Sequence, residues 1–90
     1  MKVVKNEGLK EEFDDEKLYD SAYYPAREAA LDKEEANDIA EKVVWEVKSW
    51  MSDHEDEVFS SEEIRQKVLE ILRDVEQDVA FLYRTHLDIN

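Results

Sequence analysis

A stripe of apolar residues at helical spacing is the feature that most restricts how this 90-residue chain can fold. The stripe consists of Ala36, Ile39, Ala40, Val43, Val47, Trp50 and Met51. Residues three and four apart share one face of an α-helix, so the stripe predicts an amphipathic helix through the middle of the chain. Asp32, followed by Glu35 three residues later, is a capping-box pattern and marks its start. The apolar face of this helix needs other elements to cover it.

A helix is also predicted ahead of this one. Asp14 or Asp15 can cap a helix beginning near Glu16, and acidic residues in its first turn favour the helix dipole. Its apolar face contains Leu18, Ala22, Pro25, Ala26 and Ala29. Because proline lacks a backbone donor, we expect Pro25 to interrupt this helix with a kink near Tyr24.

Two more helices are predicted after the central one. Ser60 and Glu63 form a second capping-box pattern, followed by an apolar face of Ile64, Val68, Ile71, Leu72 and Val75. Asp78 can start a last helix, whose inward face contains Val79, Leu82, Tyr83 and His86. The chain therefore carries four helical segments.

Short strands are predicted near the N-terminus. Residues 2–5 and 9–13 flank Asn6, Glu7 and Gly8, where Asn and Gly suit the positive φ of a tight hairpin turn. Val58 and Phe59 are candidates for a third strand. Strands this short need support from other elements. The predicted fold class is therefore α+β, mainly α, with a small two- to three-stranded antiparallel sheet capping a four-helix bundle, in one domain over residues 1–90.

Composition excludes several classes of function. The net charge is -13, from 25 acidic and 12 basic residues, which opposes binding to nucleic acid or to an anionic membrane. There is no cysteine, so thiolate zinc sites and thiol nucleophiles are absent. Without an apolar run long enough to span a membrane or a signal-peptide pattern, we expect a cytoplasmic location. The acidic residues are read as a solvated surface in preference to a docking face for a basic partner.

No pattern predicts catalysis or a metal site. His54 lies in the acidic segment 52–57, which lacks the ligand order of an EF-hand loop, so a solvated loop is the preferred interpretation. His86 lies near the C-terminus and is interpreted as a helix-end residue in preference to a catalytic base. The serines lack a nucleophile-elbow context, and no Walker or GxGxxG motif occurs. We therefore expect a protein that is not an enzyme and has no metal ligands.

Two sets of residues are candidates for binding. One candidate site for an anion arises if the hairpin folds back beside the first helix, and it consists of Lys5, Gly8, Lys17 and Ser61. From the residues alone, lysines that are simply solvated are the preferred interpretation. Trp45 lies opposite the central stripe. It either packs under a neighbouring element, which is slightly favoured, or contacts another chain. Tyr23 and Tyr24 are further candidate contacts, because aromatic residues are enriched at interfaces.

The whole chain resembles the ATP-cone domain, a regulatory nucleotide-binding module of ribonucleotide reductase large subunits and of their bacterial transcriptional repressor. The family opens with a Val-x-Lys-Arg-Asp-Gly-like stretch, matched by VVKNEG at 3–8, then Phe13 and DDEKL at 14–18. Its Val-x-Ser-Ser-x-x-Ile-Arg-x-x-Val pattern is matched by residues 58–68, and its Asp-x-x-Ala-x-x-Tyr loosely by residues 77–83. The match extends over nearly the whole chain, as a stand-alone form of the domain.

This resemblance implies a nucleotide between the sheet and the helices. Lys5 and Lys17 would hold phosphates, and Arg65 is a weaker phosphate candidate. The other implied nucleotide-binding residues are Asn6, Gly8, Glu11, Asp14, Leu18 and Ser61. Asn6 stands where the family has arginine. Losing one charge-assisted contact there costs about 1.5–3 kcal/mol, or roughly ten- to a hundredfold in affinity.

The function implied is a non-catalytic ATP- or dATP-binding regulatory domain, with or without Mg²⁺, that senses nucleotide and modulates association with itself or with a protein partner. The alternative is a degenerate ATP-cone that keeps the fold, binds no nucleotide and acts as a protein-interaction module; Asn6 and the acidic excess favour it. The choice between ATP and dATP, the number of nucleotides, the partner and the oligomeric state stay open at this point.

Overall fold

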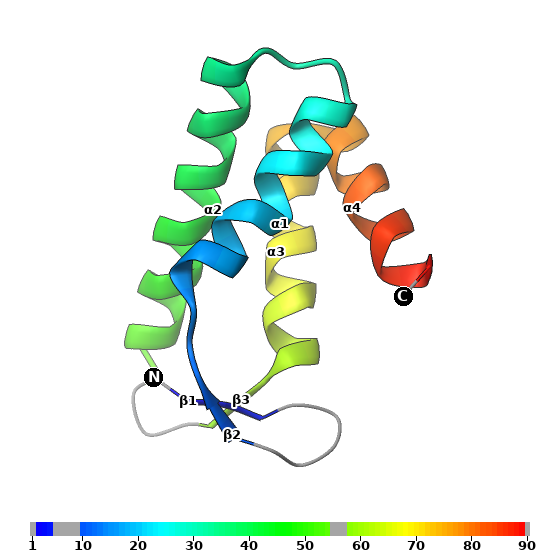
Figure 1. Ribbon diagram of the computed structural model, residues 1–90. Helices are drawn as coiled ribbons and strands as arrows, with labels where there is room; N and C mark the ends of the chain where they lie inside the picture. The colour runs from blue at the N-terminus through cyan, green and yellow to red at the C-terminus, as the bar shows by residue number, and fades with distance from the viewer. Residues whose placement is uncertain (1, 5–9, 55–57, 90) are drawn as a thin grey trace.

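The computed structural model describes the backbone of residues 2–4, 10–54 and 58–89, and side chains within residues 13–54 and 58–86. Within this part of the chain there are four helices, α1 (Asp15–Glu28), α2 (Lys33–Ser52), α3 (Ser61–Val75) and α4 (Gln77–Ile89) (Figure 1). Three very short strands, β1 (Lys2–Val4), β2 (Lys10–Glu12) and β3 (Phe59–Ser60), lie together at one end of the helices.

The predicted fold class is wrong: the protein is a helical bundle, not an α+β protein with an antiparallel sheet. The helices contain 14, 20, 15 and 13 residues, whereas the strands contain three, three and two. Strands of this length cannot form a layer with its own core. They pair in the order β2-β1-β3, and β3 runs parallel to β1. β3 ends at Ser60, and α3 begins at the next residue, so the direction of β3 is tied to that of α3.

The first two strands form the antiparallel pair predicted at the N-terminus. Val3 lies opposite Glu11, and Val4 lies opposite Lys10. On the other edge of β1, Val4 lies opposite Ser60. The predicted turn residues Asn6, Glu7 and Gly8 lie outside the described residues. The β1–β3 pairing thus brings the N-terminal segment next to the start of α3.

Helix α1 begins where the sequence predicted and continues through Pro25. Asp14 is its N-cap, and the helix extends to Glu28. The expected interruption at Pro25 does not end the helix, because Pro25 lies within its last turn and few hydrogen bonds remain after it. Pro25 is buried against the other helices.

The turn from α1 to α2 is a Schellman motif built on alanine. The N–H of Leu31 donates to the carbonyl of Ala26 over 3.2 Å, and the N–H of Ala30 donates to the carbonyl of Arg27 over 3.0 Å. These are the two bonds that define the motif. Ala30 has φ 68°, in the left-handed region that usually requires glycine. This turn returns the chain so that α2 packs along α1.

Helices α2 and α3 have the predicted caps. The Asp32 carboxylate accepts a hydrogen bond from the Glu35 N–H over 2.8 Å. Ser60 and Glu63 make both bonds of a capping box. Behind these caps, the predicted stripes form the core, which also includes Phe59 and Tyr83. Phe59 packs on Trp50 with ring centroids 4.8 Å apart, which fastens β3 to α2.

Candidate functional site

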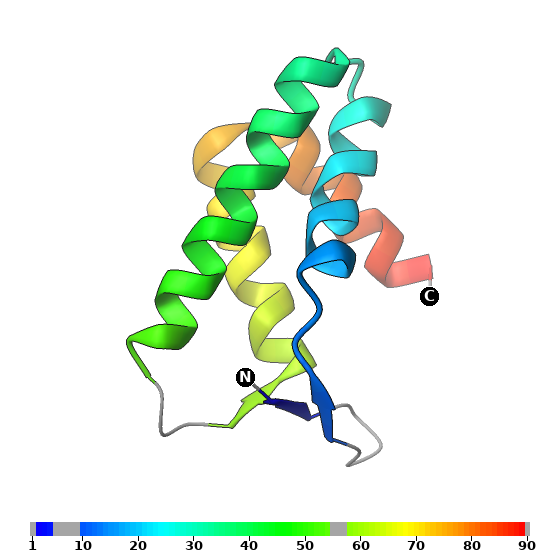
Figure 2. The ribbon, with the colours of Figure 1, turned by 60° about the vertical axis from the view of Figure 1, so that its left-hand side comes forward.

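The predicted nucleotide residues that the structure describes lie at the strand end of the bundle. There the N-termini of α1 and α3 both face the three strands (Figures 1 and 2). Asp14 and Lys17 belong to the start of α1, and Ser61 and Arg65 to the start of α3. A helix N-terminus carries partial positive charge and backbone donors, which suits an anionic ligand.

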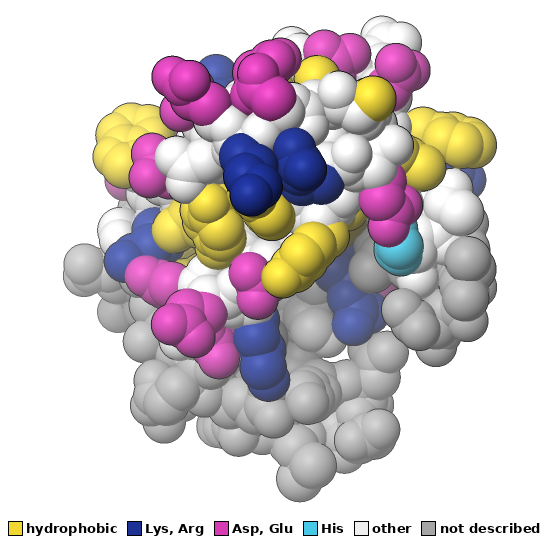
Figure 3. All heavy atoms as spheres, turned by 45° about the horizontal axis from the view of Figure 1, so that its top comes forward, with side chains coloured by type: hydrophobic (Ala, Val, Ile, Leu, Met, Phe, Trp, Pro, Cys, Tyr) yellow, Lys and Arg dark blue, Asp and Glu magenta, His cyan; other side chains and the backbone are white. Residues whose placement is uncertain are grey.

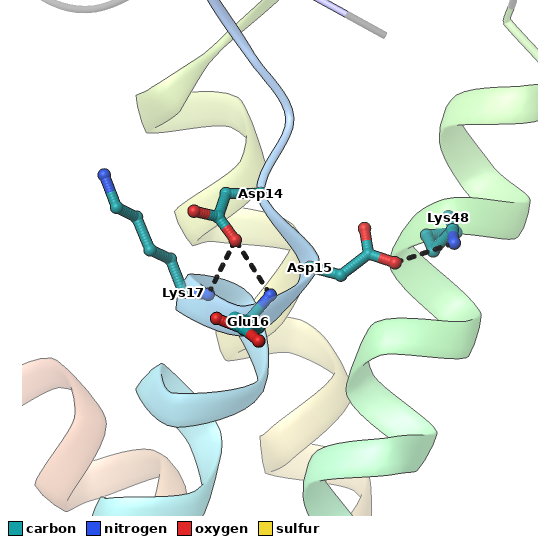
Figure 4. Close-up of polar contacts among 5 residues, drawn as sticks. All are labelled: Asp14, Asp15, Glu16, Lys17 and Lys48. Carbon is teal, nitrogen blue, oxygen red and sulfur yellow. Dashed lines mark hydrogen bonds and ion pairs between the residues drawn. The ribbon is translucent and has the colours of Figure 1, made fainter.

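Asp14 occupies part of the α1 N-terminus itself. One oxygen of its carboxylate, Oδ1, accepts hydrogen bonds from the N–H groups of Glu16 over 2.9 Å and Lys17 over 3.3 Å (Figure 4). These donors are therefore taken by a carboxylate that is already negative. The Lys17 side chain is exposed and makes no ion pair with the described residues. At this helix start, the Lys17 ammonium is thus the group available to an anion.

The start of α3 presents a hydroxyl and a guanidinium. Ser60 caps the helix, so the Ser61 side chain is not used for capping. Arg65 is exposed one turn later, on the same side of the helix as Ser61 because the two are four residues apart. The charge of Arg65 also affects the pKa of Tyr83 in α4. Burial raises the pKa of Tyr83 to about 12, and the positive charge of Arg65 opposes this rise.

The remaining predicted nucleotide residues are placed as follows. Leu18 is a core residue, 7% exposed, and its N–H donates to the Asp14 carbonyl. Glu11 lies on β2, and only its backbone is described. Lys5, Asn6 and Gly8 lie outside the described residues. The structure thus brings Lys17, Ser61 and Arg65 to one end of the bundle, while the predicted phosphate-facing turn is not described.

A hollow of about 680 Å³ lies on the flank of α1 and α2, and sequence reasoning missed it. Tyr19, Val44 and Trp45 supply its apolar lining, with Asp15, Glu16, Glu41 and Asp53 around them. Among the described residues that line it, Lys48 is the one basic residue, and its ammonium lies 2.8 Å from Asp15 (Figure 4). Four carboxylates repel a triphosphate, and the attraction of Lys48 is already compensated by Asp15, so this hollow does not suit a nucleotide.

Acidic and exposed apolar side chains share the surface near the helices. Figure 3 shows acidic side chains over much of one face, with hydrophobic side chains reaching the surface between them. Trp45 is 70% exposed and Tyr24 59% exposed. The slightly favoured prediction that Trp45 packs under a neighbouring element is therefore wrong. Tyr23 is half-buried and stacks on Tyr19 with centroids 5.6 Å apart.

The two histidines lie at exposed positions in different parts of the molecule. His54 Nδ1 is 2.9 Å from the Trp50 carbonyl oxygen. His86 does not face inward as predicted: its Nε2 is 2.9 Å from Glu28 Oε2, at the surface between α1 and α4. Among the described residues, no group of three or more acidic or histidine side chains could hold a metal ion.

The four helices pack as a bundle, and the starts of α1 and α3 lie beside the three short strands. The model of the family described as the ATP cone domain matches residues 1–86, and the chain belongs to this family. The family is a regulatory, nucleotide-binding and non-catalytic class of domain. A search of curated proteins found no significant match. None of the described helices has the length and apolarity needed to cross a lipid bilayer.

Proposed function

We propose that this chain binds ATP or dATP at the strand end of the bundle, without hydrolysing it, and that the bound nucleotide modulates association with itself or a partner. The observation that carries the proposal is the family match over residues 1–86, combined with a Lys17 that makes no ion pair with the part of the chain that the structure describes. Mg²⁺ would accompany the phosphates, reducing their repulsion by the acidic chain.

The proposed roles follow the chemistry of each side chain. Lys17 and Lys5 hold phosphate oxygens, and Arg65 contributes a second charge from α3. Asn6, Gly8, Glu11, Asp14, Leu18 and Ser61 complete the proposed nucleotide-binding residues. Asp14 supports this site mainly by fixing the first turn of α1, since its carboxylate is engaged with the N–H groups of that turn.

Titration with ATP and dATP, each with and without Mg²⁺, tests the proposal by amide NMR. We expect saturable shifts at Lys17, Leu18, Ser61 and residues 5–8. The Lys17→Ala change removes one charge-assisted contact, worth about 1.5–3 kcal/mol, and should weaken binding roughly ten- to a hundredfold. Lys33→Ala is the matched control, because Lys33 begins α2 at the opposite end of the bundle, and it should leave the affinity unchanged (Figure 1).

Two results contradict the proposal. If millimolar nucleotide moves no resonance beyond a salt control, the chain does not bind ATP or dATP. If binding is measurable but Lys5→Ala with Lys17→Ala leaves it unchanged, the proposed site is wrong. The first result favours the degenerate ATP-cone, which the Asp14 carboxylate at the α1 N-terminus and the net charge of -13 also favour.

A further inference from the structure

Trp45 projects from α2 between two hollows. The first is the hollow of about 680 Å³ against α1, and the second, of about 480 Å³, lies against α3. The second hollow is lined by four carboxylates and two lysines, namely Glu46, Asp53, Glu70, Asp74, Lys42 and Lys67. Acidic residues therefore outnumber basic ones on both sides of the exposed indole. We call Trp45 and these two hollows the Trp45 face.

A second surface has the opposite character. Leu69 and Arg73 of α3, with Gln77, Ala80, Phe81 and Arg84 of α4, line a hollow of about 290 Å³. Phe81 is 69% exposed, and the described residues that line this hollow include no acidic side chain. Neither Arg73 nor Arg84 forms an ion pair with any residue that the structure describes. We call this surface the Arg73 patch.

We propose that the Trp45 face of one copy of this chain docks on the Arg73 patch of a second copy. The indole would enter the hollow beside Phe81, and Arg73 and Arg84 would meet carboxylates that surround Trp45. Tryptophan and arginine are the residues that most often dominate binding energy at interfaces. One surface is acidic and the other basic, and each presents an exposed aromatic side chain. Opposite charges favour contact between these two surfaces over contact between two copies of the same surface.

A second copy of this chain is the partner that fits both surfaces at once. An unrelated basic protein would complement the Trp45 face but would leave the exposed Phe81 and its two arginines without a partner. Repulsion between two chains of charge -13 is screened over about 8 Å at physiological salt, so the local contacts decide the outcome.

The geometry of this contact is head-to-tail. Trp45 lies in the half of α2 nearer the strands, whereas the α3–α4 junction lies at the far end of the bundle (Figures 1 and 2). Two different surfaces meet, so each copy in a pair still has one surface free, and assembly continues into a ring or an open chain. The inference rests on the associative part of the proposed function, but it requires assembly without nucleotide.

Sedimentation of the full chain, without nucleotide and at physiological salt, tests the inference. We expect a mass that rises with concentration above the 10.7 kDa of one copy. Trp45→Ala, and separately Arg73→Glu with Arg84→Glu, should abolish the rise. Val58→Ala is the matched control, since it shortens another exposed apolar side chain that lines neither surface, and it should leave the assembly intact. Circular dichroism verifies that each variant is folded.

Mixing the two defective variants gives the sharpest result. The Trp45→Ala chain keeps its Arg73 patch, and the doubly charge-reversed chain keeps its Trp45 face. A head-to-tail contact therefore predicts a 1:1 dimer that does not grow further. A parent that stays monomeric up to about 1 mM, or a mixture that stays monomeric, overturns the inference. Because nucleotide binding is measured separately, a chain that assembles but binds no ATP contradicts only the nucleotide part of the proposed function.

Discussion

Replacing Ala30 with glycine should stabilise the protein. Ala30 has φ 68°, and the left-handed region costs a residue with a Cβ atom about 1–2 kcal/mol. Glycine removes this cost, but it also loses about 0.4–1 kcal/mol through the greater freedom of the unfolded chain. The midpoints of these two ranges differ by about 0.8 kcal/mol, which is the net gain expected in the free energy of unfolding for Ala30→Gly.

The neighbouring alanine provides a matched control. Ala29 is the C-cap of α1, and its φ of -76° is an ordinary value for any residue. Glycine relieves nothing there, and it adds unfolded-state freedom worth about 0.5–1 kcal/mol. Ala29→Gly also removes a half-buried methyl group that packs on the core. The same substitution at adjacent positions should therefore change stability in opposite directions.

Thermal unfolding followed by circular dichroism measures both variants. For a domain of this size, 1 kcal/mol shifts Tm by about 4–8 °C. We expect Ala30→Gly to raise Tm by about 2–8 °C and Ala29→Gly to lower it. If both variants lose stability equally, the left-handed turn at Ala30 is not the strained position that the Schellman bonds indicate, and the reasoning fails.

Two further predictions concern the start of α3 and the core. Ser60→Ala should lower the free energy of unfolding by about 1 kcal/mol in urea denaturation, because it removes the cap, while Ser61→Ala should change it by less than about 0.5 kcal/mol. Burial raises the pKa of Tyr83 to about 12, so its contribution to stability is fully present below its ordinary value of 10.0 and is lost as pH rises towards 12. Desolvation also raises the pKa of Tyr19, so an alkaline absorbance titration should show more than one late tyrosine step, and Tyr83→Phe should remove the last of them. An unchanged titration would contradict the burial of the Tyr83 phenol.

The helices were predictable because their signals are local. The stripe from Ala36 to Met51 and the caps at Asp32 and Ser60 are readable within one or two turns of sequence. The end of α1 could not be read from Pro25, because a proline in the last turn leaves few hydrogen bonds after it, and α1 stops within one turn of Pro25. The kink expected near Tyr24 stays a prediction. The class of the fold was misjudged because the predicted strands 2–5 and 9–13 shorten to three residues each, too few to form a layer with its own core. The parallel direction of β3 was missed because no local pattern records it.

The surfaces were harder to predict than the core. The sequence placed Trp45 opposite the apolar stripe, but whether another element covers that side depends on contacts between distant segments. Phe81 was missed although a signal existed: with Val79 and Tyr83 facing inward, a residue two positions from each lies on the outer side of α4. The nucleotide residues came from family resemblance, because single lysines such as Lys17 have no periodicity that separates ligands from solvated charges.

The first turn of α1 links the two proposed sites. Lys17 is a proposed phosphate ligand, while Asp15, two residues earlier, pairs with Lys48 in the hollow beside Trp45 (Figure 4). The Asp14 cap holds both residues in one turn, so a nucleotide that shifts this turn also shifts the acidic lining of the Trp45 face.

Coupling between two binding events is reciprocal: any factor by which ATP changes the affinity between copies must equal the factor by which assembly changes the affinity for ATP. A nucleotide bound equally well by free and assembled copies would leave the assembly unchanged, however tightly it binds. The proposed regulation therefore requires differential contact at the first turn of α1 and not nucleotide affinity alone.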